Sequence, residues 1–227
     1  MNDPGQSEID RVRAAYEERD AAPAANAYYS WENPAYVRYM QDLERRQLDA
    51  LRAAGVRLAG ARVLDVGCGS GDFLHRLGDY GAGPLSGVEL MPNRARAAME
   101  RYPALDVHVG SATEMPFDDG AFDLVTQFTC LSSVLDPAVR SAIGAEMVRV
   151  TRPGGAILSV DMRPVPVLRR LRSLARRVRR SGPPAAGGTP VEPLTAAELR
   201  RIIGLEPAAT RLAGLTEDAG PLVARSR

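Results

Sequence analysis

The chain has no lysine, few histidines and cysteines, and no long apolar run. All 29 basic residues are arginine, which we read as a coding bias of the source genome. The two cysteines, Cys68 and Cys130, have no C-x-x-C spacing and no histidine pair nearby in sequence, so neither a metal site nor a redox pair is expected. No apolar run approaches the about 18 residues of a membrane span, and the first residues are polar. We therefore expect a cytoplasmic protein without membrane insertion.

An excess of charge of one sign is absent as well. The formal net charge is +1, so the sequence gives no reason to expect bulk attraction to nucleic acid or to an anionic membrane. With 227 residues, 45% of them hydrophobic, the chain is long enough for one α/β domain with a sizeable core.

Three glycines at alternate positions follow a short apolar stretch at residues 63–66. Gly67, Gly69 and Gly71 leave this turn almost bare of side chains, and a helical pattern begins directly after it. Glycine is required where the backbone has positive φ or where a ligand approaches it closely. The turn is therefore expected to contact a ligand.

Charge narrows the class of that ligand. The dinucleotide fingerprint G-x-G-x-x-G is not met, because the third glycine is one position early and Asp72 follows it. Asp65 and Asp72 would repel a pyrophosphate but attract an ammonium group, which disfavours a dehydrogenase. Eighteen residues after Gly71, Glu89 ends a second apolar run, where nucleotide-binding folds place an acid on the ribose hydroxyls. A cationic or zwitterionic ligand with a ribose is predicted.

Apolar segments alternate with helical patterns along the middle of the chain. Strands are expected at 63–66, 85–89, 107–109, 122–128 and 156–161, with helices at 72–80, 92–102 and from 137. This alternation predicts a doubly wound, mostly parallel sheet that binds ligands beyond the carboxyl ends of its strands. The residues at those ends are Gly67, Gly69, Glu89, Leu90, Ser111, Ala112, Gln127, Phe128, Thr129 and Asp161.

Residues 1–60 are expected to form a helical arm or cap. A helix is predicted at 7–20 with Ser7 as its N-cap, and a second helix from Asn33 and Pro34 to about Gly55. Aromatic residues gather around the start of the second helix: Tyr28, Tyr29, Trp31, Tyr36 and Tyr39. Two readings stay open, namely packing onto the core and an arm that walls the substrate pocket.

Composition changes after Asp161. Residues 163–180 hold eight arginines and no acid, above an apolar stripe at helical spacing. Either this is a solvated helix face, or residues 163–190 form a basic, lid-like insertion that attracts an anionic acceptor. Residues 181–190, rich in glycine and proline, are expected to be a flexible linker.

The C-terminal part is expected to complete the sheet. Thr195 and Glu198 form a capping box for a helix at 196–203. Strands at about 209–215 and 221–224 predict a terminal antiparallel hairpin.

The sequence resembles the class I S-adenosylmethionine-dependent methyltransferases. Five motifs occur in the family's order: Leu64 to Gly71; Glu89; Gly110-Ser111-Ala112 with Met115-Pro116-Phe117; Phe122-Asp123-Leu124-Val125; and Arg152-Pro153-Gly154-Gly155. The resemblance implies a Rossmann-like fold with a seven-stranded sheet in residues 61–227. It also implies S-adenosylmethionine as the cofactor.

The resemblance assigns roles to the motif residues. The glycine turn would pass beneath the methionine part of the cofactor and Glu89 would bind the ribose hydroxyls. Ser111 stands where many relatives have an acidic residue for the adenine amino group. The implied cofactor-binding set is Asp65, Gly67, Cys68, Gly69, Gly71, Glu89, Leu90, Met91, Ser111, Ala112, Gln127 and Phe128.

Catalysis and acceptor binding are assigned by position. Methyl transfer needs mainly placement of the acceptor, and a general base only where the acceptor must lose a proton. Asp161 and Tyr29 are the catalytic candidates, whereas His75 and His108 are read as structural because neither ends a strand. The substrate-binding candidates are Tyr28, Trp31, Tyr36 and Thr129.

The resemblance therefore implies a methyltransferase for a small-molecule acceptor in secondary or cell-surface metabolite biosynthesis. A nucleic-acid methyltransferase is the alternative, although no recognition module is added and Gln127-Phe128-Thr129-Cys130 stands where base methyltransferases carry an Asn/Asp-Pro-Pro-aromatic motif. A second alternative is a non-catalytic scaffold of the same fold.

Overall fold

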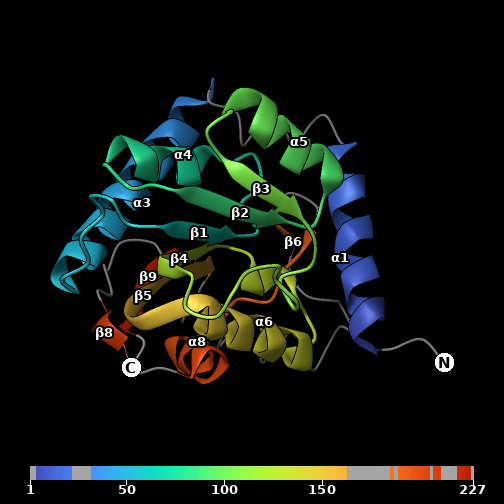
Figure 1. Ribbon diagram of the computed structural model, residues 1–227. Coiled ribbons are helices and arrows are strands. Elements are labelled where there is room, and N and C mark those ends of the chain that lie inside the picture. The colour runs from blue at the N-terminus through green and yellow to red at the C-terminus, as the bar shows by residue number, and fades with distance from the viewer. Residues whose placement is uncertain are drawn as a thin grey trace.

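A mostly parallel sheet forms the centre of the fold (Figure 1). The structure is a computed structural model that describes residues 4–21, 32–162, 185–186, 189–204, 207–210 and 219–225. The parallel strands are β1 (Val63–Val66), β2 (Leu85–Glu89), β3 (Asp106–Val109), β4 (Phe122–Phe128) and β5 (Thr151–Met162). In the described residues the strand order is β3-β2-β1-β4-β5-β9-β8. Strand β9 (Ala219–Arg225) pairs antiparallel with both of its neighbours, β5 and β8 (Pro207–Thr210).

The strand order reverses between β1 and β4. From β1 the chain proceeds outward through β2 to β3, and then returns to place β4 on the other side of β1. In parallel α/β sheets such a switch point opens a crevice beyond the carboxyl ends of the strands. The Rossmann-like arrangement predicted from the sequence is confirmed.

Helices cover both faces of the sheet (Figure 1). On one face lie α3 (Pro34–Ala53), α4 (Asp72–Asp79) and α5 (Pro92–Arg101); on the other lie α6 (Pro137–Val150) and α8 (Ala196–Ile203). Side chains alternate along each strand, so neighbours enter different cores. Val63 of β1 packs with Leu74 of α4, whereas the adjacent Leu64 packs with Ile143 of α6.

Three predicted helix starts are confirmed. The Asn33 side chain accepts the Ala35 N–H at 3.0 Å, with Pro34 in the first turn of α3. Asp136 caps α6, and Thr195 forms a capping box with Glu198 at the start of α8. Each cap satisfies backbone N–H groups that have no partner inside the helix.

Some boundaries differ from the sequence prediction. Helix α1 (Pro4–Asp20) begins three residues before Ser7, so Ser7 is an exposed helical residue and the predicted N-cap was wrong. Strand β5 begins at Thr151, which pairs with Phe122, and not at residue 156 as predicted. The pairing is irregular between Phe122 and Leu124, and this irregularity accommodates Gly154 and Gly155 within the strand. Strands β8 and β9 begin two residues earlier than predicted.

The predicted linker contains a short ladder. Strands β6 (Ala185–Ala186) and β7 (Thr189–Pro190) pair antiparallel, so part of residues 181–190 is regular where a flexible linker was expected. The arginine-rich segment 163–180 lies outside the described residues.

Candidate active site at the carboxyl ends of the strands

The three glycines of the first turn all have positive φ, but their surroundings differ. Their φ angles are +73° at Gly67, +56° at Gly69 and +74° at Gly71. A Cβ at Gly69 would meet no atom within 4 Å, whereas one at Gly71 would lie 2.7 Å from Leu105 Cδ1. Gly69 is therefore an open position in the cavity lining. Gly71 is buried against a neighbouring segment and does not line the cavity.

Glu89 joins the end of β2 to the glycine turn. Its Oε2 accepts the Gly69 N–H and its Oε1 accepts the Met91 N–H, both at 2.8 Å. Burial raises the pKa of Glu89, although these hydrogen bonds oppose the rise. A carboxylate has about four lone-pair sites, so two acceptor positions remain for a ligand. Glu89 lines the cavity described below.

Asp65 is the second carboxylate at the glycine turn. It is buried in β1, and its Oδ1 accepts a hydrogen bond from Thr126 Oγ1 at 2.7 Å. Burial raises the pKa of Asp65 to about 7; the Thr126 hydrogen bond lowers it and the Glu89 charge raises it further. Burial likewise raises the pKa of the Cys68 and Cys130 thiols, so both stay neutral. Neither thiol is activated as a nucleophile.

Three predicted site residues lie behind the cavity wall. Met91 is buried and contributes its backbone N–H to Glu89. Gln127 donates to Ser159 Oγ at 2.6 Å, while its side-chain oxygen accepts the Cys130 N–H at 3.0 Å. Asp161 is fully buried and its Oδ2 accepts the Ser132 N–H at 3.1 Å. Gln127 and Asp161 therefore shape the loop after β4, and this placement argues against Asp161 as a general base.

The loop after β4 carries unusual backbone geometry. Thr129 has φ of +53°, a conformation rare for a β-branched residue and one that persists only where the surroundings enforce it. Its N–H donates to the Val160 carbonyl at 2.7 Å, and its carbonyl accepts the Ser132 and Ser133 hydroxyls at 3.4 and 3.2 Å. The short helix η1 (Leu131–Ser133) is thereby held against the cavity.

Helix α1 runs across the carboxyl ends of the strands and roofs the cavity (Figure 1). Its first turns are tied to the start of α6, because Glu8 accepts the Leu135 and Asp136 N–H groups. Its last turn is tied to α5, where Arg94 donates two hydrogen bonds to Asp20. The cavity face of α1 consists of Glu8, Ile9, Val12, Tyr16 and Arg19.

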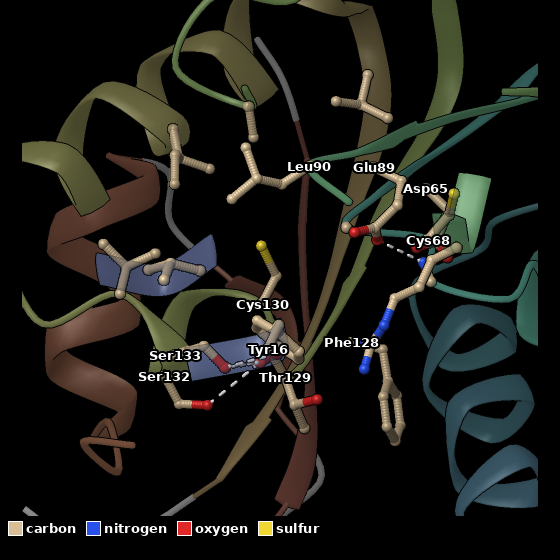
Figure 2. Close-up of a pocket in the computed structure, with 18 of the residues that line it drawn as sticks. Tyr16, Asp65, Cys68, Glu89, Leu90, Phe128, Thr129, Cys130, Ser132 and Ser133 are labelled. Atoms are coloured by element: carbon tan, nitrogen blue, oxygen red, sulfur yellow. Dashed lines mark hydrogen bonds between the residues drawn. The ribbon is translucent and has the colours of Figure 1, made fainter. Parts of the chain in front are cut away.

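The cavity has a volume of about 770 Å³ and two chemically distinct sides. Carboxylates and glycines border it near β1 and β2, among them Asp65, Asp72 and Glu89. The side near α1 and α6 is mostly aliphatic, with Ile9, Val12, Val134, Val139, Ile143 and Val191 in its lining. Leu90 and Ala112 also line the cavity, directly after β2 and shortly after β3, and Figure 2 shows Leu90 beside Glu89.

Most other predicted residues line this cavity. Gly67, Cys68, Ser111, Phe128, Thr129 and Tyr36 do so. Tyr28, Tyr29 and Trp31 lie outside the described residues. His75 stacks on Tyr102 with 4.1 Å between ring centroids, and His108 packs edge-on against Phe117.

The sequence analysis predicted a helical arm at residues 1–60 but named none of the α1 residues that line the cavity. Ile9, Val12, Tyr16 and Arg19 recur at spacings of three and four, which places them on one helix face. This spacing was the available signal, but the helix is strongly polar and its partner surface is distant in sequence. Arg94, Ser132 and Ser133 were also missed, because the residues that they contact in the cavity wall are distant in sequence.

Among the described residues, no helix combines the length and the apolar character that a bilayer crossing requires. In the same part of the chain, no three His, Cys, Asp or Glu side chains are grouped so that they could hold a metal ion.

The sequence of this chain matches known proteins over part of its length. Residues 63–155 match a family model described as a methyltransferase domain. The demethylmenaquinone methyltransferase of Beutenbergia cavernae is 38% identical over 117 residues, which cover 52% of this chain and 45% of that protein. Residues 63–155 therefore form a methyltransferase domain, as the motifs of the class I S-adenosylmethionine-dependent family predicted.

One more curated relative and one solved structure are also methyltransferases by name. The ubiquinone biosynthesis O-methyltransferase of Xanthomonas oryzae pv. oryzae is 31% identical over 157 residues, or 67% of this chain and 59% of that protein. The chain spans about half the length of the curated relatives it matches. The solved magnesium protoporphyrin IX methyltransferase of Synechocystis PCC 6803, with bound SAH, superimposes with a TM-score of 0.69. That match covers 99% of this chain and 100% of the other at 16% identity, and so supports the fold alone.

Proposed function

We propose that this protein is an S-adenosylmethionine-dependent methyltransferase whose acceptor is a small molecule with a largely apolar body. One observation carries the proposal: a single cavity joins the carboxylate-lined glycine turn to an apolar side walled by α1 and α6. A two-substrate reaction needs both ligands in one enclosure, and the two sides differ in the chemistry of the ligand they suit.

The residues at the glycine turn fit the cofactor. The open position at Gly69 allows close approach to the backbone, and Glu89 keeps two acceptor positions for ribose hydroxyls. Glu89 and Asp65 supply negative potential beside the turn, which suits a cationic ligand, whereas the charge of Asp72 is paired with Arg101 at 3.2 Å. Leu90, Ser111 and Ala112 line the adjoining wall, where the family places adenine. The cofactor supplies a methyl group on a positively charged sulfur.

The protein's own residues would then orient the acceptor and exclude water. Positioning alone contributes roughly 7 to 11 kcal/mol toward lowering a barrier of this kind. Helix α1 closes the cavity from above, held at both ends by Glu8 and by Asp20. Since Asp161 is fully buried behind the cavity wall, we do not assign it the role of general base.

The acceptor side supports a small molecule over nucleic acid. The lining near α6 is aliphatic, and the two arginines that line the cavity, Arg19 and Arg94, lie over the Tyr16 ring. We extend the proposal to a role in secondary or cell-surface metabolite biosynthesis. We also propose an arm at 1–60 and a domain at 61–227 with a seven-stranded sheet closed by the β8–β9 hairpin. Cytoplasmic placement and an anionic acceptor met by residues 163–190 are parts of the same proposal.

Calorimetric titration tests the cofactor assignment. We expect S-adenosylmethionine to bind the wild type and NADH not to bind. Glu89→Ala should weaken binding at least tenfold, because it removes the ribose acceptors and releases the Gly69 and Met91 N–H groups. Glu100→Ala, an exposed glutamate on α5, is the matched control and should bind like the wild type. Absence of binding to folded wild type would refute the enzyme proposal and favour a scaffold.

A further inference from the structure

Tyr16 adds a phenol hydroxyl to the part of the cavity wall that also holds Thr129, Ser132 and Ser133. Its ring packs against the core cluster that contains Val12, Val134 and Ile143. Figure 2 shows the Tyr16 side chain beside Ser133 and Thr129, within the cavity lining. Arg94 lies over the ring at 4.5 Å from its centroid and Arg19 at 5.7 Å, and both arginines line the same cavity.

The hydrogen bonds around Tyr16 determine the direction in which each proton points. Ser133 Oγ donates to the Thr129 carbonyl at 3.2 Å, and a carbonyl can only accept. A serine hydroxyl has one proton, so Ser133 Oγ is the acceptor in its 3.0 Å contact with Tyr16 Oη. The Tyr16 proton therefore points at Ser133. The phenol oxygen presents lone pairs, and no proton, to the cavity.

This arrangement orients a ligand but does not remove its proton. Burial is the main cause that raises the pKa of the Tyr16 phenol, so the hydroxyl stays protonated at neutral pH. The chain from Tyr16 through Ser133 ends at the Thr129 carbonyl, which cannot take up a proton. These groups therefore cannot carry a proton away from a ligand.

Resting on the proposed function, we propose that Tyr16 selects acceptors whose reacting group carries an O–H or N–H donor, and that Ser133 sets this polarity. A hydroxyl or amine would donate to Tyr16 Oη and leave its own lone pair free to attack the methyl group. The proton of the methylated group is then released to solvent, because Tyr16 and Ser133 do not take it up. An ether or carbonyl at the same place would set its oxygen lone pairs against those of Tyr16. The neighbouring hydroxyls of Ser132 and Ser133 donate to the Thr129 carbonyl, so their protons do not compensate the mismatch.

Matched ligand pairs test this polarity. Binding of naphthol against methoxynaphthalene, and of decanol against methyl nonyl ether, is measured by NMR titration on protein first saturated with S-adenosylhomocysteine. Saturation is confirmed separately, so a failure of the cofactor site is distinguished from a failure of this proposal. We expect the donor member of each pair to bind about tenfold more tightly to the wild type.

Two variants separate Tyr16 and Ser133. Tyr16→Phe keeps the ring under Arg94 and should bind both members of a pair equally. Ser133→Ala frees the Tyr16 proton to turn toward the cavity, so the preference should shift toward the ether, an effect that loss of packing alone would not produce. Tyr80→Phe, whose hydroxyl donates to Glu44 outside the cavity, is the control and should keep the wild-type preference.

Three results would overturn the proposal. They are equal binding of both pair members to the wild type, a donor preference that survives in Tyr16→Phe, and no binding of any probe to the saturated protein. Once an acceptor is identified, a pH profile of turnover that keeps its shape in Tyr16→Phe is expected. A profile that loses a limb would instead make Tyr16 a proton-transfer group.

Discussion

Arg94 of α5 donates two hydrogen bonds to the Asp20 carboxylate at the end of α1, the one from Nε at 3.1 Å. The same guanidinium lies over the Tyr16 ring. One side chain therefore fixes both the position of the cavity roof and the plane of an aromatic group within the cavity. Asp20 and Arg94, which this pairing joins, are 74 positions apart in sequence.

Asp20→Ala should loosen the roof. Both partners are partly exposed, so we expect a loss of only about 1 kcal/mol in the free energy of unfolding. The larger effect should be local, with faster amide hydrogen exchange in the last two turns of α1 and weaker binding of S-adenosylmethionine. Hydrogen exchange by mass spectrometry measures the first effect and calorimetry the second.

Asp10→Ala is the matched control for this prediction. Asp10 is also an aspartate of α1, but it is exposed and bonds only to Gln6 and Arg13 of the same helix. Unchanged exchange at the end of α1 in Asp20→Ala, or equal acceleration in both variants, would contradict a roof held by Arg94.

Local signals in the sequence predicted much of the fold. The helix starts at Asn33, Asp136 and Thr195 were correct because a cap is decided by residues within one turn. The order of strands and helices followed from the alternation of patterns, and the five motifs placed the glycine turn and Glu89 at one edge. These features need no knowledge of distant neighbours.

Side-chain direction could not be obtained in this way. Asp161 and Thr129 both stand at strand ends, yet Asp161 points into the packed interior while Thr129 faces the cavity. Which face a residue takes is decided by the register with the neighbouring strands and by the loop after β4. The roof formed by α1 depends on long-range pairs such as Glu8 with Leu135, for which a single sequence contains no signal.

The glycines of the turn should separate into two functional classes. Gly71→Ala places a Cβ 2.7 Å from Leu105 and requires positive φ, so we expect a loss of about 2 to 3 kcal/mol in the free energy of unfolding. Gly69→Ala also has positive φ but meets open space. Its loss should be about 1 to 2 kcal/mol, with a disproportionate loss of cofactor binding because its methyl group occupies the ligand's side of the turn.

Chemical denaturation and calorimetry on the two variants test this separation. The decisive quantity is the ratio between loss of binding and loss of stability, which should be larger for Gly69→Ala. A Gly69→Ala variant that binds S-adenosylmethionine like the wild type would show that the open position is not the ligand's side.

Cofactor affinity should depend on pH through Asp65. Burial raises the pKa of this carboxyl to about 7, so the empty site holds it partly protonated at neutral pH. A bound cation favours the ionised form, which lowers the pKa and releases a proton. Affinity should therefore rise as the pH increases from about 6 toward 7, by at most tenfold per pH unit, and level off above about 8.

Titrations in buffers of different ionisation enthalpy measure the released proton directly. In Asp65→Asn the release should vanish and the affinity should become flat over the same range, at a value below that of the ionised wild type. Thr126→Val removes the hydrogen bond that stabilises the Asp65 carboxylate, so it should move the rise in affinity to higher pH. A wild type whose affinity is independent of pH, or a dependence that persists in Asp65→Asn, would assign the cofactor's charge to a different partner.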